Sequence, residues 1–252
     1  GEATVIADLD SIADNSHPDG ITSVTEDNGN EILYVTTTGS SNPESGTLST
    51  DGTIQKIDTG TGAVTQFVDS TVLDNPTGIA ADKSGNLYVA DQGTGNIYKI
   101  PVDSEGNAGD IEPLTALPPA GVDIDEPHGL TLVTNNDGSI TLYTTDEGDN
   151  SNNIIKIDIA SASDSTITDI IELTPESSGG TSTDTDVSNA EFNTPHGITT
   201  NGNGAIFIAD ENNNRIQIIT PGGNVVTFAG TGTAGDSDGD PDEAQFNKPR
   251  GM

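Results

Sequence analysis

The sequence predicts an all-β fold built from a four-stranded unit that repeats along the chain. The triplet Pro-x-Gly, followed by an apolar residue, starts at Pro18, Pro76, Pro127, Pro195 and Pro249. Its glycines, at positions 20, 78, 129, 197 and 251, are 58, 51, 68 and 54 residues apart by subtraction. Short Val- and Ile-rich runs follow each of the first four triplets, separated by Asp/Asn-Gly turn signals. A regular spacing of strands and turns over about 50 residues indicates a repeat architecture.

Each complete repeat is expected to hold four strands. The first begins at the triplet, and the second centres on an aromatic residue, with Tyr34, Tyr88, Tyr143 and Phe207 in equivalent places. The third strands are "IQKID" from Ile54, "IYKIP" from Ile97, "IIKID" from Ile154 and "IQIIT" from Ile216. The fourth are "AVTQFV" from Ala63, "DIEPLT" from Asp110, "ITDIIEL" from Ile167 and "VVTFAG" from Val225. Four antiparallel strands per repeat form a blade of a β-propeller. We therefore expect one propeller domain over residues 1–252, with four blades and the opening strand of another.

Two of the repeats resemble NHL repeats. They are "TPHGITTNGNGAIFIADENNNRIQIITPGGNVVTFAG" from Thr194 and "NPTGIAADKSGNLYVADQGTGNIYKI" from Asn75. Blades one and three depart from the pattern, through an insertion at residues 39–52 and a long tail at residues 174–191. The resemblance implies a propeller, which in this family usually has about six blades.

The two ends of the sequence raise a question about closure of the ring. "FNKPRGM" at residues 246–252 repeats the opening of "FNTPHGITT" at residue 192, and "ATVIADL" at residues 3–9 is typical of a fourth strand. Three interpretations stay open: the domain is incomplete at its C-terminus, the ring closes with one odd blade, or the ends pair between molecules. Exposed strand edges favour such head-to-tail self-assembly, through residues 1–10 or 246–252.

The charge of the chain restricts its partners. It has 7 Lys and Arg against 41 Asp and Glu, a formal net charge of −34. Such a surface repels nucleic acid and anionic lipid, and no apolar stretch reaches the ~20 residues of a membrane span. We therefore expect no nucleic acid and no membrane insertion. The acidity, together with many Asn, Thr, Ser and Gly residues, favours an extracellular or cell-surface location or a high-salt habitat.

The first candidate metal site is the row of x residues in the Pro-x-Gly triplets. These residues are Asp19, Thr77, His128, His196 and Arg250. In a propeller the first strands line the central channel, so the x side chains would ring one mouth of it. Two imidazoles and a carboxylate, from His128, His196 and Asp19, could bind a metal ion there. The family resemblance implies a precedent, since some NHL-like lyases hold a metal on the channel axis with histidines. The alternative is that a polar residue merely fits the turn before glycine.

The second candidate is the acidic loop "GDSDGDPDE" from Gly235. Its carboxylates are Asp236, Asp238, Asp240, Asp242 and Glu243. Hard oxygen ligands on a turn are what calcium prefers, although the spacing is not that of an EF-hand. The NHL resemblance also implies that a Gly- and Asp-rich loop at this place need not bind anything.

Two classes of function remain open. The first is an extracellular propeller that binds a protein partner or assembles with itself, because the chain has variable loops and no Gly-x-Ser-x-Gly elbow, Cys nucleophile or phosphate loop. The second is a metal-dependent lyase or lactonase-like enzyme with its site at the channel mouth. Any cofactor would be Ca²⁺ or another divalent metal, and the alternative is that the chain has none.

The net charge predicts that salt stabilises the fold. The charges repel one another more in the compact state than in the unfolded state, and salt screens them. The melting temperature should therefore rise between about 0.01 M and about 1 M NaCl, as the Debye length falls from about 30 to about 3 Å. An unchanged melting temperature across this range would contradict the electrostatic argument.

Overall fold

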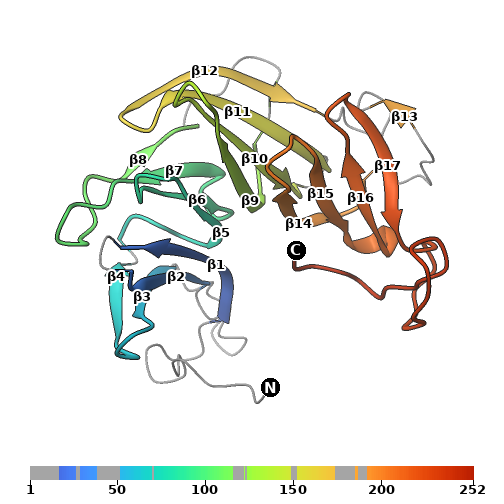
Figure 1. Ribbon diagram of the computed structural model, residues 1–252, viewed down its shortest axis with the longest axis horizontal. Helices are drawn as coiled ribbons and strands as arrows, with labels where there is room; N and C mark the ends of the chain where they lie inside the picture. Colours follow the sequence, from blue (N-terminus) through green and yellow to red (C-terminus); the bar gives the residue numbers. More distant parts are fainter. Residues whose placement is uncertain are drawn as a thin grey trace. The chain divides into compact units, whose positions relative to one another are not determined.

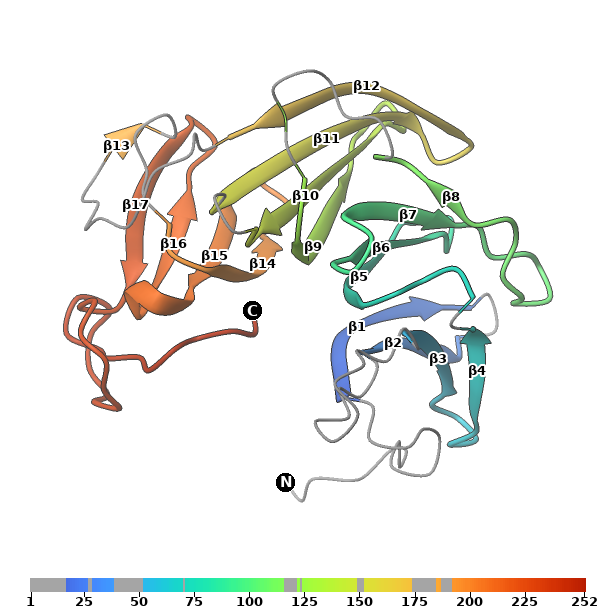
Figure 2. The same cartoon turned by 180° about the vertical axis from the view of Figure 1, so that it is seen from behind.

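The computed structural model describes residues 17–26, 29–38, 52–69, 71–115, 122, 124–148, 152–173, 185–186 and 192–252. The chain divides into two compact units, Gly1–Leu114 and Thr115–Met252. Every named strand belongs to one of four sheets, and neighbouring strands in each sheet are antiparallel (Figures 1 and 2). This arrangement confirms the predicted all-β, propeller-type blades.

The first unit holds two four-stranded sheets. The strands of one lie in the order β1 (His17–Thr25), β2 (Glu31–Thr38), β3 (Thr53–Asp58) and β4 (Val64–Val68). Those of the other lie in the order β5 (Pro76–Ala81), β6 (Leu87–Asp91), β7 (Asn96–Ile100) and β8 (Glu112–Pro113). The strands follow chain order, as the repeat predicted.

The second unit also holds two sheets. One consists of β9 (Pro127–Thr134), β10 (Ile140–Asp146), β11 (Asn153–Ser161) and β12 (Asp164–Glu172). The other consists of β14 (Pro195–Thr200), β15 (Ile206–Asp210), β16 (Arg215–Ile219) and β17 (Asn224–Ala229), with β13 (Thr185–Asp186) added beside β17. A single turn of 3-10 helix, η2 (Glu211–Asn213), follows β15. Across the described residues, no helix has the length and apolar character that would let it cross a membrane.

Two elements differ from the sequence prediction. The expected fourth strand over residues 110–115 is reduced to the two residues of β8, although the Leu114 N–H still donates to the carbonyl oxygen of Ile97 at 2.8 Å. The short strand β13 lies inside the tail at residues 174–191, for which no strand was expected. The predicted strand at residues 3–9 and residues 39–51 of the insertion lie outside the described residues. That residues 1–252 form a single domain stays a prediction.

The aromatic residues of two second strands, Tyr34 and Tyr143, pack toward a neighbouring sheet within their units. Tyr34 of β2 belongs to the same buried cluster as Leu87 and Val89 of β6, and it meets Phe67 edge-on at 4.8 Å between ring centroids. Tyr143 of β10 packs against a cluster that joins Ile154 of β11 to the last blade, whose buried members are Phe192, Ile198, Ile206, Ile208, Ile219 and Val225. Burial of these side chains between sheets supplies the main stabilising term for each pair of blades.

The glycines of three triplets permit a close approach to the backbone of the next triplet along the chain. A Cβ atom added to Gly20 would collide with the carbonyl oxygen of Thr77, and one at Gly129 would collide with that of His196. A Cβ at Gly197 would likewise collide with the carbonyl oxygen of Arg250. The segment Pro249–Met252 therefore lies over β14 as β14 lies over β9, and both views show the C-terminus beside β14 (Figures 1 and 2).

This close approach predicts a large cost for Gly129→Ala. The new methyl group would meet backbone, which can yield only if the first strands separate, so we expect a loss of about 1–3 kcal/mol or more in the free energy of unfolding. Gly222→Ala is the matched control, because the nearest atom to an added Cβ lies 3.9 Å away, on Thr220. The measurement is urea unfolding of both variants. Equal stabilities for the two variants would contradict the packing argument.

Candidate metal centre

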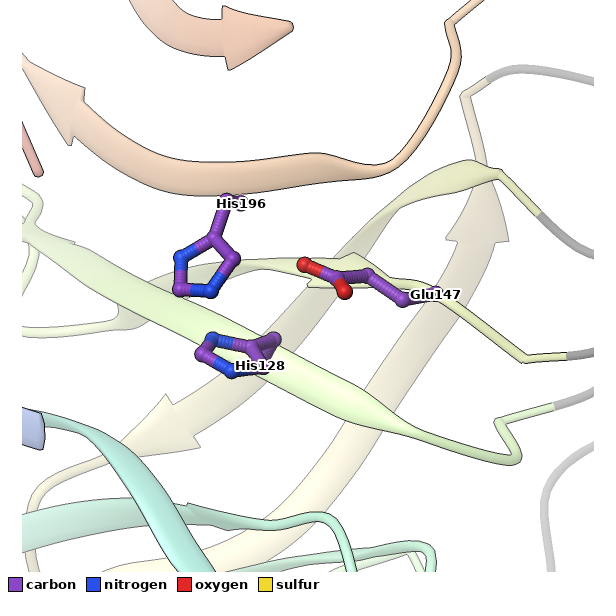
Figure 3. Close-up of side chains that lie close together, drawn as sticks. All are labelled: His128, Glu147 and His196. Carbon is purple, nitrogen blue, oxygen red and sulfur yellow. The ribbon is translucent and has the colours of Figure 1, made fainter. Parts of the chain in front are cut away.

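Two histidines meet in the second unit. His128 lies at the start of β9 and His196 at the start of β14, each as the x residue of its Pro-x-Gly triplet. Their ring centroids are 3.7 Å apart and the ring planes are inclined by 50° (Figure 3). The contact follows directly from the close packing of consecutive first strands over Gly129.

A carboxylate completes the group. Glu147 directly follows β10, and its side chain points toward both rings (Figure 3). The donor atoms of His128, Glu147 and His196 all lie within 4.8 Å of one another. These three side chains form a group that could hold a metal ion, and it is the one such group found among the described residues.

The end of β10 is fixed by buried polar contacts, and these position Glu147. Asp146 is fully buried, and its carboxylate accepts the backbone N–H of Glu126 at 2.8 Å. The backbone N–H of Glu147 in turn donates to the carbonyl oxygen of Glu126 at 3.1 Å. Because Asp146 also pairs with Pro127 in the sheet register, Glu147 is held next to the triplet that carries His128.

A buried hydroxyl joins the two histidine-bearing strands. The Oγ1 atom of Thr145 accepts the backbone N–H of Gly129 at 2.8 Å and donates to the carbonyl oxygen of His196 at 2.8 Å. Thr36 makes the same two contacts in the first unit, with Gly20 and Thr77. Hydrogen bonds from one hydroxyl to both strands restrict the separation of the two rings.

The environment of His128 disfavours its charged form. Burial and, to a smaller extent, the Arg250 guanidinium lower the pKa of His128 to about 4, while Glu211 opposes the shift. The imidazole is therefore neutral near pH 7. A neutral imidazole offers a lone pair to a metal ion without first losing a proton.

A second carboxylate, that of Glu211, forms ion pairs with two cationic side chains. Glu211 begins η2, and its side chain is 3% exposed. Arg250 donates to it through Nε at 2.8 Å and through Nη2 at 3.3 Å, and the Lys248 ammonium lies 3.5 Å from it. Although burial raises the pKa of Glu211, the hydrogen bonds and charge of Arg250, with smaller contributions from His196 and Lys248, lower it overall.

The structure brings two of the predicted site residues together, since His128 and His196 meet as expected. Within the second unit the third member of the group is Glu147. Asp19 lies on β1 in the first unit and is exposed, and its part in a metal site stays a prediction. In the acidic loop, Asp236, Asp238, Asp240 and Asp242 are all exposed and belong to no metal-binding group among the described residues. The calcium prediction for that loop stays a prediction.

A sequence signal for Glu147 exists in the repeat itself. In three blades the second strand ends in a buried aspartate, Asp91, Asp146 or Asp210. The residue that follows it is Gln92, Glu147 or Glu211. This position is adjacent to the x residues in the second unit, so alignment of the repeats on the aspartate would have identified both glutamates.

Family models match two of the repeats. Residues 192–219 match the NHL repeat, and residues 64–99 match a beta-propeller repeat. The chain carries NHL-type β-propeller repeats. This confirms the resemblance drawn from the sequence. A search of curated proteins gives no match.

Solved structures share the fold of this NHL-type chain. An auxiliary nutrient binding protein from Bacteroides thetaiotaomicron matches with a TM-score of 0.64 and 20% identity, over 87% of this chain and 50% of its own. A structure of a nidogen/laminin complex matches with a TM-score of 0.57 and 17% identity, over 93% of this chain and 67% of its own. The structure of inactive virginiamycin B lyase from Staphylococcus aureus with quinupristin matches with a TM-score of 0.52 and 18% identity, over 85% of this chain and 56% of its own. The chain thus spans about half the length of the nutrient binding protein, and the likeness concerns the fold alone.

The pKa of His128 predicts a pH dependence of stability. Between about pH 6.5 and about pH 4 the unfolded imidazole is protonated and the folded one is not, so stability falls as the pH falls through this window. His128 alone should remove at most about 3 kcal/mol of the free energy of unfolding by pH 4. Above about pH 6.5, His128 contributes no pH dependence to the free energy of unfolding.

The comparison of metal-free wild type with His128→Asn isolates this contribution, because both chains share the same carboxylates. Urea unfolding from pH 7 to pH 4 should show the smaller loss in the variant. His17→Asn, which replaces an exposed histidine, should keep the wild-type profile. Parallel profiles for wild type and His128→Asn would show that His128 titrates normally.

Proposed function

We propose that this NHL-type propeller binds a divalent metal ion through His128, Glu147 and His196. The observation that carries the proposal is the convergence of their donor atoms within 4.8 Å. Ligand atoms bound to one ion at about 2.0–2.2 Å lie at most about 4.4 Å apart, so the site requires little rearrangement. Two imidazoles and one carboxylate suit zinc and similar transition metals better than calcium, which prefers oxygen ligands.

Three protein ligands leave room for a further ligand. This arrangement is typical of catalytic metal sites, whereas structural zinc sites are closed by four protein ligands. A divalent ion held in this way supplies a Lewis acid that polarises a carbonyl or similar oxygen. The chain's own contribution is to hold His128 neutral and to fix both rings through Thr145.

The function that these features support best is a metal-dependent activity on a small molecule, of the lyase or lactonase-like class. The similar fold of virginiamycin B lyase is compatible with this class. An extracellular location fits the charge of −34.

A second candidate is a module that binds a protein partner. It is favoured by exposed apolar side chains, which include Phe228, 51% exposed and edge-on to Phe207 at 5.1 Å. The nidogen/laminin structure shows a similar fold in a protein complex. Self-assembly through the terminal strands stays a prediction, since residues 1–10 lie outside the described residues.

Metal binding is tested by calorimetric titration of the chelator-treated chain with Zn²⁺, Mn²⁺ and Ca²⁺. We expect one ion per chain and a preference for Zn²⁺. His196→Ala and Glu147→Gln should each weaken binding at least about 10- to 100-fold, because each removes a ligand or its charge.

His17→Ala is the matched control, since it removes the third histidine of the sequence from an exposed position on β1. Asp238→Asn combined with Asp240→Asn tests the acidic loop in the same assay. If His196→Ala binds the ion as tightly as wild type, the proposed centre is wrong. If the loop variant alone loses Ca²⁺, the ion belongs to the loop.

A further inference from the structure

We infer that the metal centre takes a small carboxylate-bearing anion, with Arg250 as the group that binds its negative charge. This inference rests on the proposed function, because the anion would lie between the ion and the guanidinium. Three features of the second unit support it: the equivalent positions of the x residues in the triplets, the charges near the proposed ion, and the geometry of the Arg250–Glu211 ion pair.

Arg250 occupies the next place in the row that carries the two histidines. It is the x residue of the fifth triplet, as His128 and His196 are of the third and fourth. Its carbonyl oxygen lies against Gly197 as the carbonyl oxygen of His196 lies against Gly129. Its side chain therefore leaves the backbone at the position equivalent to the two rings, one strand further on.

The two glutamates follow the same rule. Glu147 and Glu211 each come directly after the buried aspartate that ends a second strand. Glu147 joins the x residues His128 and His196, while Glu211 pairs with the x residue Arg250. One structural position thus supplies a metal ligand in one blade and a support for a guanidinium in the next.

The ion pair leaves the guanidinium accessible. The Glu211 side chain is 3% exposed, whereas that of Arg250 is 64% exposed. The carboxylate accepts Nε and Nη2 of the same guanidinium, which fixes the plane of the fork. A guanidinium oriented in this way is suited to bind a planar carboxylate.

The charges favour an anion once the metal is bound. Glu147 and Glu211 contribute −2 and Lys248 and Arg250 contribute +2, and the buried Asp146 beside Glu147 makes the sum −1, which a divalent ion would turn to +1. The chain has only 7 basic residues against 41 acidic ones, and two of the 7 lie at one buried carboxylate. On a molecule with a charge of −34, an anion needs such a local excess of positive charge to bind.

The test uses the chain loaded with Co²⁺, whose visible spectrum reports changes at the metal. Acetate and oxalate are titrated against wild type, and phosphate is the comparison anion. We expect a saturable spectral change with the carboxylates, and at least a 10-fold weaker apparent affinity in Arg250→Gln. Co²⁺ affinity itself should change less than about 3-fold in that variant, because Arg250 is not a ligand.

Two control variants keep the result interpretable. Lys248→Gln, which removes a charge from the same carboxylate through an ammonium that is 62% exposed, should weaken anion binding less than Arg250→Gln does. Arg250→Lys keeps the charge but not the planar fork, so it should restore part of the affinity. The melting temperatures of all variants show whether the fold is retained.

The outcomes separate the two proposals. If wild type binds no Co²⁺, the proposed function fails and this inference fails with it. If Co²⁺ binds but neither carboxylate alters the spectrum, or Arg250→Gln binds both as tightly as wild type, only the role of Arg250 is overturned. Tighter binding of phosphate than of either carboxylate would also overturn the assignment of ligand class.

Discussion

The close approach of consecutive first strands is the constraint on which the rest of the molecule depends. A side chain at Gly20, Gly129 or Gly197 would collide with a backbone carbonyl of the following first strand. Absence of a Cβ at that point brings together the residues that precede the glycine. In the second unit those residues are His128 and His196, and their ring centroids are 3.7 Å apart because the backbones leave no room between them. The geometry of the candidate centre is therefore a consequence of how blades pack.

Buried polar groups then determine the orientation of the strand ends. Asp91 accepts the backbone N–H groups of Asp74 and Asn75, and Asp146 accepts that of Glu126, so the same contact recurs before two triplets. Such buried carboxylates are tolerated because backbone donors satisfy them. Because the aspartate fixes the turn, the residue that follows it can differ between blades. This residue is Gln92, Glu147 or Glu211.

The sequence predicted the blades well because their signals are local. The aromatic position in each second strand, the Val and Ile runs and the Asp-Gly turns each specify structure within a few residues, and Tyr34, Tyr88, Tyr143 and Phe207 all lie on second strands as expected. The pair of histidines was also predictable, since both are x residues of one repeated triplet. Glu147 was missed because its signal is the repeated aspartate before it and not a motif of its own, and the register of Asp146 with Pro127 is what shows that it reaches the triplet.

The charge distribution connects the fold to the site. An excess of carboxylates over the surface would concentrate cations near the molecule and repel anions, whatever the fold. The surface at Glu211 differs, because the side chains of Lys248 and Arg250 both pair with this one buried carboxylate and give the surface a local positive charge. Burial of Glu211 alone would be costly, and Arg250 compensates for it with two hydrogen bonds while remaining exposed itself. The same pairing thus stabilises the segment that follows the last described blade against β14 and places a positive charge near His128. A structural requirement, the compensation of a buried charge, therefore also creates the electrostatic asymmetry of the candidate centre.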